Sequence, residues 1–186
     1  MRSPSTRRLR VLFALLGGCK SSGGHAPTPP GIALGSLTVT STSFPSSVVP
    51  IDFTCDGADR SPQLTWSAPP EGTQSFALVC DDPDASGGTF THWIAYDLRG
   101  DLRALPEGAD PSAFGGAAAL NDFKRAGYAG PCPPRRELHH YSFRVYALNA
   151  RLNISTSATR EDFEGALRAG SGHVLAEGAL VATFAR

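Results

Sequence analysis

The feature that most constrains this 186-residue chain is an unbroken run of apolar side chains that ends in two aspartates and a proline. The run covers residues 75–82 and alternates with the two-residue period of a strand. One face carries Phe76, Leu78, Cys80 and Asp82, and the other carries Ala77, Val79 and Asp81. Because Pro83 has no amide hydrogen, pairing stops there and the chain must turn. We therefore predict a core strand that presents Asp82 at its end, on an apolar face.

Two later segments predict strands that carry histidines. The segment 90–98 alternates Phe90, His92, Ile94, Tyr96 and Leu98 on one face. The segment 138–148 alternates His139, Tyr141, Phe143 and Val145 on one face, with His140, Ser142, Arg144 and Tyr146 on the other. This alternation puts His92 on a buried face and His139 beside Tyr141, with His140 turned away from both.

The remaining segments predict shorter strands and one helix. Strands are expected over 37–44, 51–55, 61–66 and 180–184, with a long surface excursion over 99–128. Thr159 and Asp162 form a capping-box pair ahead of Phe163 and Leu167, which indicates a helix, and 173–177 is expected to add a helical turn. The turn-like connections, with 20 Gly and 15 Pro, favour a mostly β protein: an antiparallel two-sheet sandwich with a C-terminal helix.

The N-terminus predicts an export signal rather than part of the fold. Residues 1–18 combine four arginines with a short apolar run, and Cys19 then stands where a bacterial lipobox places the lipidated cysteine. Residues 19–35 are rich in Ser, Gly and Pro, which indicates a flexible tether to a domain over 36–186. We expect a lipid-anchored protein of the bacterial cell envelope, at the outer membrane or facing the periplasm. The alternatives are an unlipidated secreted or periplasmic protein, and a cytosolic protein with a chance basic start.

The balance of charge excludes one class of partner. Seventeen basic residues match seventeen acidic ones, so the chain has no basic footprint for nucleic acid. No apolar run in the sequence is long enough to span a bilayer. The expected partners are therefore a small ligand and a membrane reached through the N-terminal lipid, with any protein partner left open.

A series of short motifs in collinear order makes the sequence resemble the phosphatidylethanolamine-binding protein family, and within it the bacterial Raf-kinase-inhibitor-like branch. The matching pieces are Cys55-Asp56-Gly57, Ser61–Trp66, Asp82-Pro83-Asp84-Ala85, His92-Trp93, Asn121-Asp122, Gly127-Tyr128, Gly130–Pro134, His139-His140-Tyr141 and Gly172–Glu177. The resemblance spans about residues 36–186. It implies a β-sandwich with a small cavity that binds phosphate-like anions and phospholipid head groups, without a cofactor or a required metal.

Carried over by position, the resemblance implies a ligand pocket formed by Asp82, Asp84, His92, Gly130, Pro133, His139 and Tyr141. The two imidazoles can donate from a ring nitrogen, and main-chain amides around Gly130 can approach an oxyanion because no side chain intervenes. Asp82 is expected to orient an imidazole and favour its charged form. Three positions depart from the family: Lys124 and Arg136 replace common glycines, and His140 replaces a common arginine.

Each motif also has a purely structural interpretation. His92 is equally consistent with a core histidine paired with Asp82 alone, and Asp82-Pro83-Asp84 with a plain turn. For Trp93 we expect packing. Cys55 and Cys132 lie in family-like motifs beside the implied pocket, so a disulfide is expected in an oxidising compartment, while Cys80 is expected to be a buried thiol.

The function that follows is non-enzymatic binding of a phosphorylated small molecule or phospholipid head group, with regulation as an extension of that role. One alternative is an interaction protein of the protease- or kinase-inhibitor type. The other is a His/Asp hydrolase or a metal site. The sequence lacks the G-x-S-x-G and H-E-x-x-H motifs, and Ser142 alternates away from His139, which disfavours this last pair.

Overall fold

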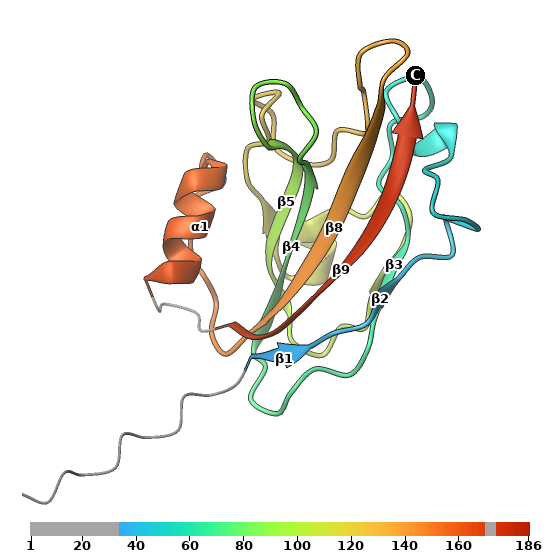
Figure 1. Cartoon of the computed structure of the whole chain (residues 1–186). Helices are drawn as coiled ribbons and strands as arrows, with labels where there is room; N and C mark the ends of the chain where they lie inside the picture. The colour runs from blue at the N-terminus through green and yellow to red at the C-terminus, as the bar shows by residue number, and fades with distance from the viewer. Residues whose placement is uncertain (1–33, 170–173) are drawn as a thin grey trace, which may run out of the picture. The chain divides into compact units, whose positions relative to one another are not determined.

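The strand predicted over 75–82 lies inside a six-stranded sheet in the computed structural model (Figure 1). This strand, β4 (Ser75–Asp82), pairs antiparallel with β5 (Phe90–Arg99) and with β8 (Leu138–Leu148). The long β9 (Val174–Ala185) pairs antiparallel with β8. Two short strands, β1 (Gly35–Ser36) and β7 (Ala117–Ala118), complete the order β1-β9-β8-β4-β5-β7.

The structure describes residues 34–169 and 174–186, which fall within a single compact unit over residues 32–186. The predicted signal over 1–18, Cys19, most of the 19–35 tether and the position of His173 lie outside the described residues. In the described part of the chain, no helix has the length and apolar character needed to cross a membrane.

A smaller sheet covers one face of the large one and makes the sandwich. It contains β2 (Val39–Thr40), β3 (Leu64–Trp66) and β6 (Ala104–Leu105), all paired antiparallel. The main core fills the space between the sheets and includes Leu64, Trp66, Phe76, Leu78 and Phe143. Burial of these apolar side chains is the main stabilising contribution to the fold. The predicted mostly β sandwich is confirmed.

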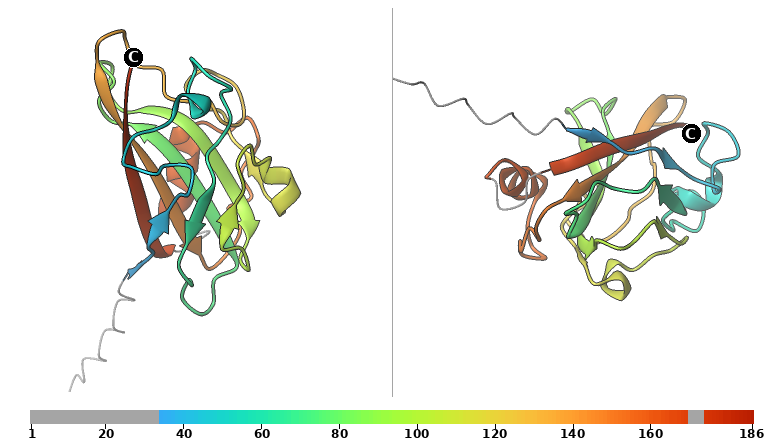
Figure 2. Two further views of the ribbon diagram at one scale, coloured as in Figure 1. Left: turned by 90° about the vertical axis from the view of Figure 1, so that its right-hand side faces the viewer. Right: turned by 90° about the horizontal axis from the view of Figure 1, so that it is seen from below.

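A second core covers the opposite face of the large sheet. Ala77, Val79 and Ile94 pack there against Phe163 of helix α1 (Arg160–Arg168). Figures 1 and 2 show α1 on the side of the large sheet away from β2 and β3. The predicted capping box is present, with Thr159 and Asp162 bonded reciprocally at the start of the helix. Both faces of β4 are thus buried, as its two apolar sets predict.

Three local predictions are wrong. The segment 51–55 is not a strand: Ile51–Phe53 is a 3-10 helix, η1, because the amides of Phe53 and Thr54 bond back over three residues to Pro50 and Ile51. The strand predicted over 37–44 shrinks to β2. The helical turn predicted over 173–177 is instead the start of β9 from Val174 onward, whose register with β8 extends to Leu148. The excursion over 99–128 contains β6, η2 (Pro111–Phe114) and β7.

The single face predicted for β5 is also wrong, because the strand is irregular at two points. The register with β4 shifts between Cys80 and Asp81, which leaves His92 without a partner. Trp93 is consequently fully buried in the main core, while the preceding His92 contacts Tyr141 on the same side of the sheet. A bulge of this kind re-aims one side chain without ending the strand. The predicted packing role of Trp93 is confirmed.

Candidate functional site

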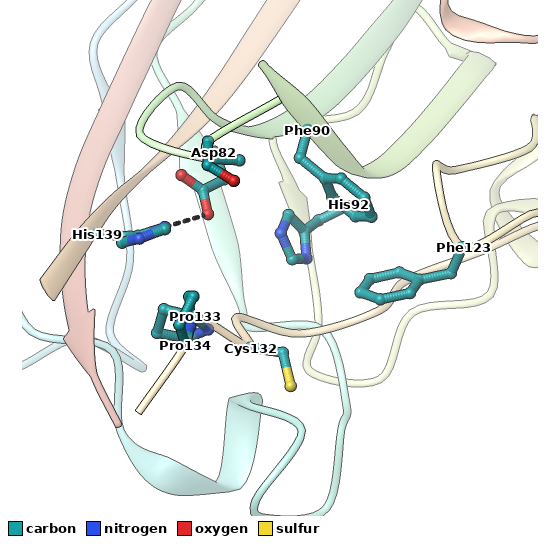
Figure 3. Close-up of a pocket in the computed structure, with 10 residues that line it drawn as sticks. Asp82, Phe90, His92, Phe123, Cys132, Pro133, Pro134 and His139 are labelled. Carbon is teal, nitrogen blue, oxygen red and sulfur yellow. Dashed lines mark hydrogen bonds and ion pairs between the residues drawn. The ribbon is translucent and has the colours of Figure 1, made fainter. Parts of the chain in front are cut away.

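A cavity of about 190 Å³ opens where β4 ends and where β5 and β8 begin (Figure 3). It is lined by Asp82, Ala85, Ser86, Phe90, His92, Phe123, Cys132, Pro133, Pro134 and His139. Antiparallel pairing explains this meeting, since the last residues of β4 lie beside the first residues of both its neighbours. Two imidazoles separated by 47 positions of sequence therefore face one hollow. The volume is below the ~300–1,000 Å³ of pockets for drug-sized ligands, so it suits a small head group.

Asp82 holds one of the two imidazoles by a direct hydrogen bond. Its Oδ2 atom lies 2.7 Å from Nδ1 of His139, and both side chains are only about 5% exposed. The other carboxylate oxygen accepts from the amide of Asp84 at 2.9 Å, across the turn at Pro83. The prediction that Asp82 orients an imidazole is confirmed, and the imidazole is that of His139.

The second ring nitrogen of His139 also faces a carboxylate. Nε2 lies 3.2 Å from Oε2 of Glu137, whose side chain is 57% exposed. A carboxylate oxygen only accepts, so a ring with a carboxylate at each nitrogen is satisfied when both nitrogens carry hydrogen. The hydrogen bond that His139 donates to Asp82 accordingly raises the pKa of His139, and the nearby Glu137 adds to this against the opposing effect of burial. The two carboxylates therefore favour the protonated form of His139.

His92 has the opposite character. Its Nδ1 lies 2.7 Å from the carbonyl oxygen of Ala129, so Nδ1 is the donor and Nε2 keeps a lone pair in the neutral ring. Burial lowers the pKa of His92, despite the partial compensation by that carbonyl. At neutral pH this ring therefore presents an acceptor. The interpretation of His92 as a core histidine paired with Asp82 alone is wrong, because the bond of Asp82 goes to His139.

Asn121 and Asp122 explain why the chain passes so close to His92. The side-chain amide of Asn121 donates to the carbonyls of His92 and Gly127 at 3.4 and 3.1 Å. Asp122 accepts from the amide of Thr91 at 2.7 Å and returns a backbone bond to the Thr91 carbonyl. The Asn-Asp pair thus fastens the loop along the irregular start of β5 and brings Ala129 to the ring of His92.

Aromatic rings form the apolar wall of the cavity. The ring of Phe90 lies 4.8 Å from that of Phe123 and 5.2 Å from that of His92. Beneath them, Tyr141 meets His92 edge to face at 5.3 Å. These contacts fix the plane of the His92 ring, and they surround it with a low-polarity environment that disfavours its charged form.

A disulfide ties down the proline-rich wall. Cys55 and Cys132 are joined, with their Cα atoms 5.5 Å apart, which confirms the predicted pair. Pro133 follows directly and lines the cavity, as the resemblance implied. Cys80 is a buried free thiol, also as predicted. The bridge joins residues 77 positions apart in sequence, and it adds a covalent link where the amide of Cys55 already donates to the carbonyl of Pro131 at 3.1 Å and the hydroxyl of Tyr128 donates to the carbonyl of Phe53 at 2.7 Å.

Three of the residues implied to form the pocket do not line the cavity. The carboxylate of Asp84 turns outward and accepts from both the amide and Nδ1 of His140 at 2.7 Å, which lowers the pKa of Asp84. The amide of Gly130 is used by Asp59 at 2.6 Å, so it is not free for an oxyanion. A Cβ at Gly130 would overlap the carbonyl of Phe53, and this close approach is why glycine stands there.

Tyr141 lies beneath the cavity rather than on its surface. It is fully buried, and its hydroxyl makes no hydrogen bond within the described residues. Burial raises its pKa, and the negative charge of Asp82 adds to the effect, so the hydroxyl keeps its proton. His140, predicted outside the pocket, lies on the outer face of β8 with Asp84.

Sequence reasoning missed two residues of chemical interest. Glu137 shares the strand parity of His139 two positions away, so the signal was present. Phe123 follows the Asn121-Asp122 motif without any periodic pattern, and only the folded loop shows that its ring reaches the cavity. Among residues 34–169 and 174–186, no three His, Cys, Asp or Glu side chains gather in a way that would hold a metal ion.

Comparison with known proteins agrees with this geometry. Residues 40–185 match the family model described as phosphatidylethanolamine-binding protein. A UPF0098 protein of Aquifex aeolicus is 42% identical over 155 residues, which cover 81% of this chain and 89% of that protein. The lipoprotein LppC of Mycobacterium tuberculosis is 37% identical over 174 residues, 85% of each chain.

Solved structures show the same likeness. The crystal structure of a phosphatidylethanolamine-binding protein homologue, CT736 of Chlamydia trachomatis, is 31% identical with a TM-score of 0.72, and covers 82% of this chain and 99% of that one. The family model matches residues 40–185, which include most of the sandwich, and these bacterial relatives cover 81–85% of this chain. The chain therefore belongs to the phosphatidylethanolamine-binding protein family.

Proposed function

We propose that this protein binds the phosphate-containing head group of a small molecule or phospholipid without transforming it. One observation carries the proposal: two buried imidazoles with opposite partners line a cavity of about 190 Å³, since His139 has a carboxylate at each ring nitrogen and His92 has a carbonyl at Nδ1. A phosphate oxygen replaces the Glu137 carboxylate at Nε2 of His139 and gains a charge-assisted hydrogen bond. Nε2 of His92 accepts from an O–H or N–H group of the same ligand.

The carboxylate of Asp82 gives the site a second kind of selectivity. A bare carboxylate would repel a phosphate, but here the charge is shared with His139. A ligand ammonium can approach the remaining acceptor capacity of Asp82. Head groups that join an anion to a cation, such as ethanolamine phosphate, are therefore favoured over inorganic phosphate.

The contacts around the cavity support binding over turnover. Activation of a nucleophile needs a base whose lone pair points at it. Ser86 is the only hydroxyl-bearing side chain among those that line the cavity, and no hydrogen bond joins it to either ring in the described structure. Both nitrogens of His139 face carboxylates, which stabilises a donor rather than a base.

For location, we propose the lipid-anchored envelope position expected from Cys19. The naming of LppC as a lipoprotein supports this, although that name belongs to the relative. The disulfide between Cys55 and Cys132 is also typical of an oxidising compartment.

The deciding experiment is calorimetric titration of phosphorylethanolamine into the wild type and into variants of the two imidazoles. We expect His139→Asn, which keeps a donor for Asp82, to weaken binding by about 10- to 100-fold, the range of a lost charged hydrogen bond. His92→Ala is expected to weaken it in the same direction. The matched control is His140→Ala, a histidine outside the cavity, which should leave the affinity unchanged.

Equal affinities in all four proteins would reject the site. Mass spectrometry of the ligand after the titration separates binding from hydrolysis, and a hydrolysed product would assign the hydrolase alternative instead. Elemental analysis of the same sample tests the metal alternative. The inhibitor alternative is tested by adding the protein to a protease or a kinase and measuring whether the activity of that enzyme falls.

A further inference from the structure

Two segments that line the cavity continue into exposed side chains outside it. Phe123 lines the cavity, and Lys124 follows it directly. Arg135 and Arg136 follow Pro134, which lines the opposite wall. We call these four residues the rim. All four are exposed, and Phe123, at 46% exposed, is among the large apolar side chains least covered by the fold.

Two rim cations, Lys124 and Arg136, have an unusual backbone conformation. Five non-glycine residues in the described ranges have positive φ: Asp59, Asp97, Lys124, Arg136 and Asn153. Asp and Asn tolerate this conformation, whereas long side chains seldom adopt it. The two exceptions, at φ 63° and 71°, are both cations, and each lies within two positions in sequence of a residue that lines the cavity, Phe123 or Pro134. Local strain of this kind is concentrated at functional sites.

Internal ion pairing does not account for these cations. Arg135 and Arg136 have no ion pair within the described part of the chain, and Lys124 lies 4.0 Å from Asp122, at the limit of an ion pair. The nearby carboxylates are already engaged, Glu137 with His139 and Asp122 with the amide of Thr91. The rim therefore presents positive charge to an external partner.

Phe123 indicates what kind of partner that is. Its ring packs against Phe90 and His92, with the guanidinium of Arg125 5.8 Å from its centre, and Phe123 nevertheless stays 46% exposed. A partly exposed aromatic ring beside exposed cations matches the boundary of an anionic bilayer, where the ring meets the acyl region and the cations meet phosphates.

We propose that the rim docks the mouth of the cavity onto an anionic phospholipid bilayer, so that the head group is taken from a membrane rather than from solution. This inference rests on the proposed head-group function. Each rim cation contributes an attraction equivalent to about a fivefold gain in partition. On this proposal, the positive φ of Lys124 and Arg136 lowers the stability of the fold, and the two cations in return strengthen binding to the anionic surface.

The test is sedimentation with vesicles of phosphatidylcholine containing phosphatidylglycerol, compared with vesicles of phosphatidylcholine alone. Every sample is the full chain with Cys19→Ser, so that no acyl anchor forms and the N-terminal sequence is constant. The double variant Lys124→Gly/Arg136→Gly should lose about 30-fold in partition onto the anionic vesicles. The wild-type binding should disappear in about 1 M salt, where the Debye length falls to ~3 Å.

The same double variant should keep or raise its melting temperature, by up to about 2–4 °C for each glycine, because glycine relieves the positive φ. This combination of weaker vesicle binding and undiminished stability is not expected of a purely structural change. Lys124→Asn/Arg136→Asn, which also suits the backbone, should lose partition equally. The matched control Arg103→Gln/Arg168→Gln removes two exposed cations away from the cavity and should have no such effect.

Calorimetry with phosphorylethanolamine separates this inference from the function beneath it. The rim variants should bind the soluble ligand within about twofold of the wild type, since neither cation lines the cavity and both are screened by solvent. Soluble binding without rim-dependent vesicle binding overturns the docking inference alone. Rim-dependent vesicle binding without soluble binding overturns the head-group function alone. Self-association that the double variant abolishes without vesicles would assign the rim to a second copy, and that too overturns the inference.

Discussion

Replacing Glu137 by Gln should strengthen phosphate-ester binding, because this side chain occupies the nitrogen that the ligand needs. Its Oε2 lies 3.2 Å from Nε2 of His139, within the reach of a hydrogen bond. A ligand oxygen can take that place only after the carboxylate leaves. The effect of the change on affinity is therefore the free energy of the contact that the ligand must break.

The exposure of the glutamate sets the size of the effect. Two unit charges 3.2 Å apart attract by about 1.3 kcal/mol in water and by about 5 kcal/mol at an effective dielectric of 20. The Glu137 side chain is 57% exposed, and it loses rotamer freedom when it pairs. Exposed pairs of this kind contribute about 0.2–1 kcal/mol. We accordingly expect Glu137→Gln to bind phosphorylethanolamine about 1.5- to 5-fold more tightly.

The assay combines calorimetry at about pH 6 with an NMR titration of the His139 ring. Loss of Glu137 should lower the pKa of His139, because one of the two carboxylates that favour its cation is gone. At the chosen pH the remaining bond to Asp82 keeps the ring charged. Glu161→Gln, which removes a carboxylate from α1, is the matched control and should change neither quantity. Weaker binding by Glu137→Gln, or an unmoved His139 titration, would refute the reasoning.

Three further predictions concern the stability of the fold around the cavity. Gly130→Ala should lower the free energy of unfolding by about 1–3 kcal/mol in urea titrations, since its Cβ meets the backbone of η1, and a wild-type midpoint would contradict this. Reduction of the Cys55–Cys132 bridge should cost about 2–4 kcal/mol by the same assay, with the Cys55→Ser/Cys132→Ser variant insensitive to reductant, and equal stability in both states would oppose it. Since the pKa of His139 is raised by Asp82, the stability it contributes is complete below about pH 6.5 and is lost as pH rises through the folded-state pKa. In urea titrations, His139→Asn should abolish that part of the pH dependence. The sign would be contradicted if the wild type instead lost stability on acidification through this window and the variant did not.

The strands that the sequence predicts correctly are those whose pattern is decided by burial alone. The bounds of β4 and β8 match the predicted 75–82 and 138–148, because alternation along each strand reflects two distinct environments. In 51–55 the same alternation misleads. Ile51 is 58% exposed, and the chain turns there under the constraint of the backbone bonds to Pro50 and Ile51. Alternation over only five residues is weak evidence for a strand.

The parity of β5 fails for a reason that no local pattern contains. The extra residue at His92 is accommodated by the loop that Asn121 and Asp122 fasten to the strand, thirty positions away. At this irregular point His92 contacts Tyr141 and the next residue, Trp93, is buried in the main core, on the same side of the sheet. The meeting of Asp82 and His139 is different. Asp82 ends β4 and His139 lies near the start of β8, and these strands pair antiparallel, so their proximity could be inferred from the sequence motifs.

The chemical difference between the two imidazoles also lies beyond sequence reasoning, and it decides what the cavity can hold. His92 and His139 are the same residue type on the same side of one sheet, yet one bonds a carbonyl and the other bonds carboxylates. A carbonyl stabilises a neutral ring with a free lone pair, whereas a carboxylate at each nitrogen stabilises the cation. A fully ionised phosphate finds only one donor here, because the lone pair of His92 repels its oxygens. A ligand that brings its own hydrogen, as a phosphate hydroxyl or an ammonium group, satisfies both rings at once. Under the proposed head-group function, we therefore expect the cavity to discriminate by the protonation of its ligand as much as by its charge.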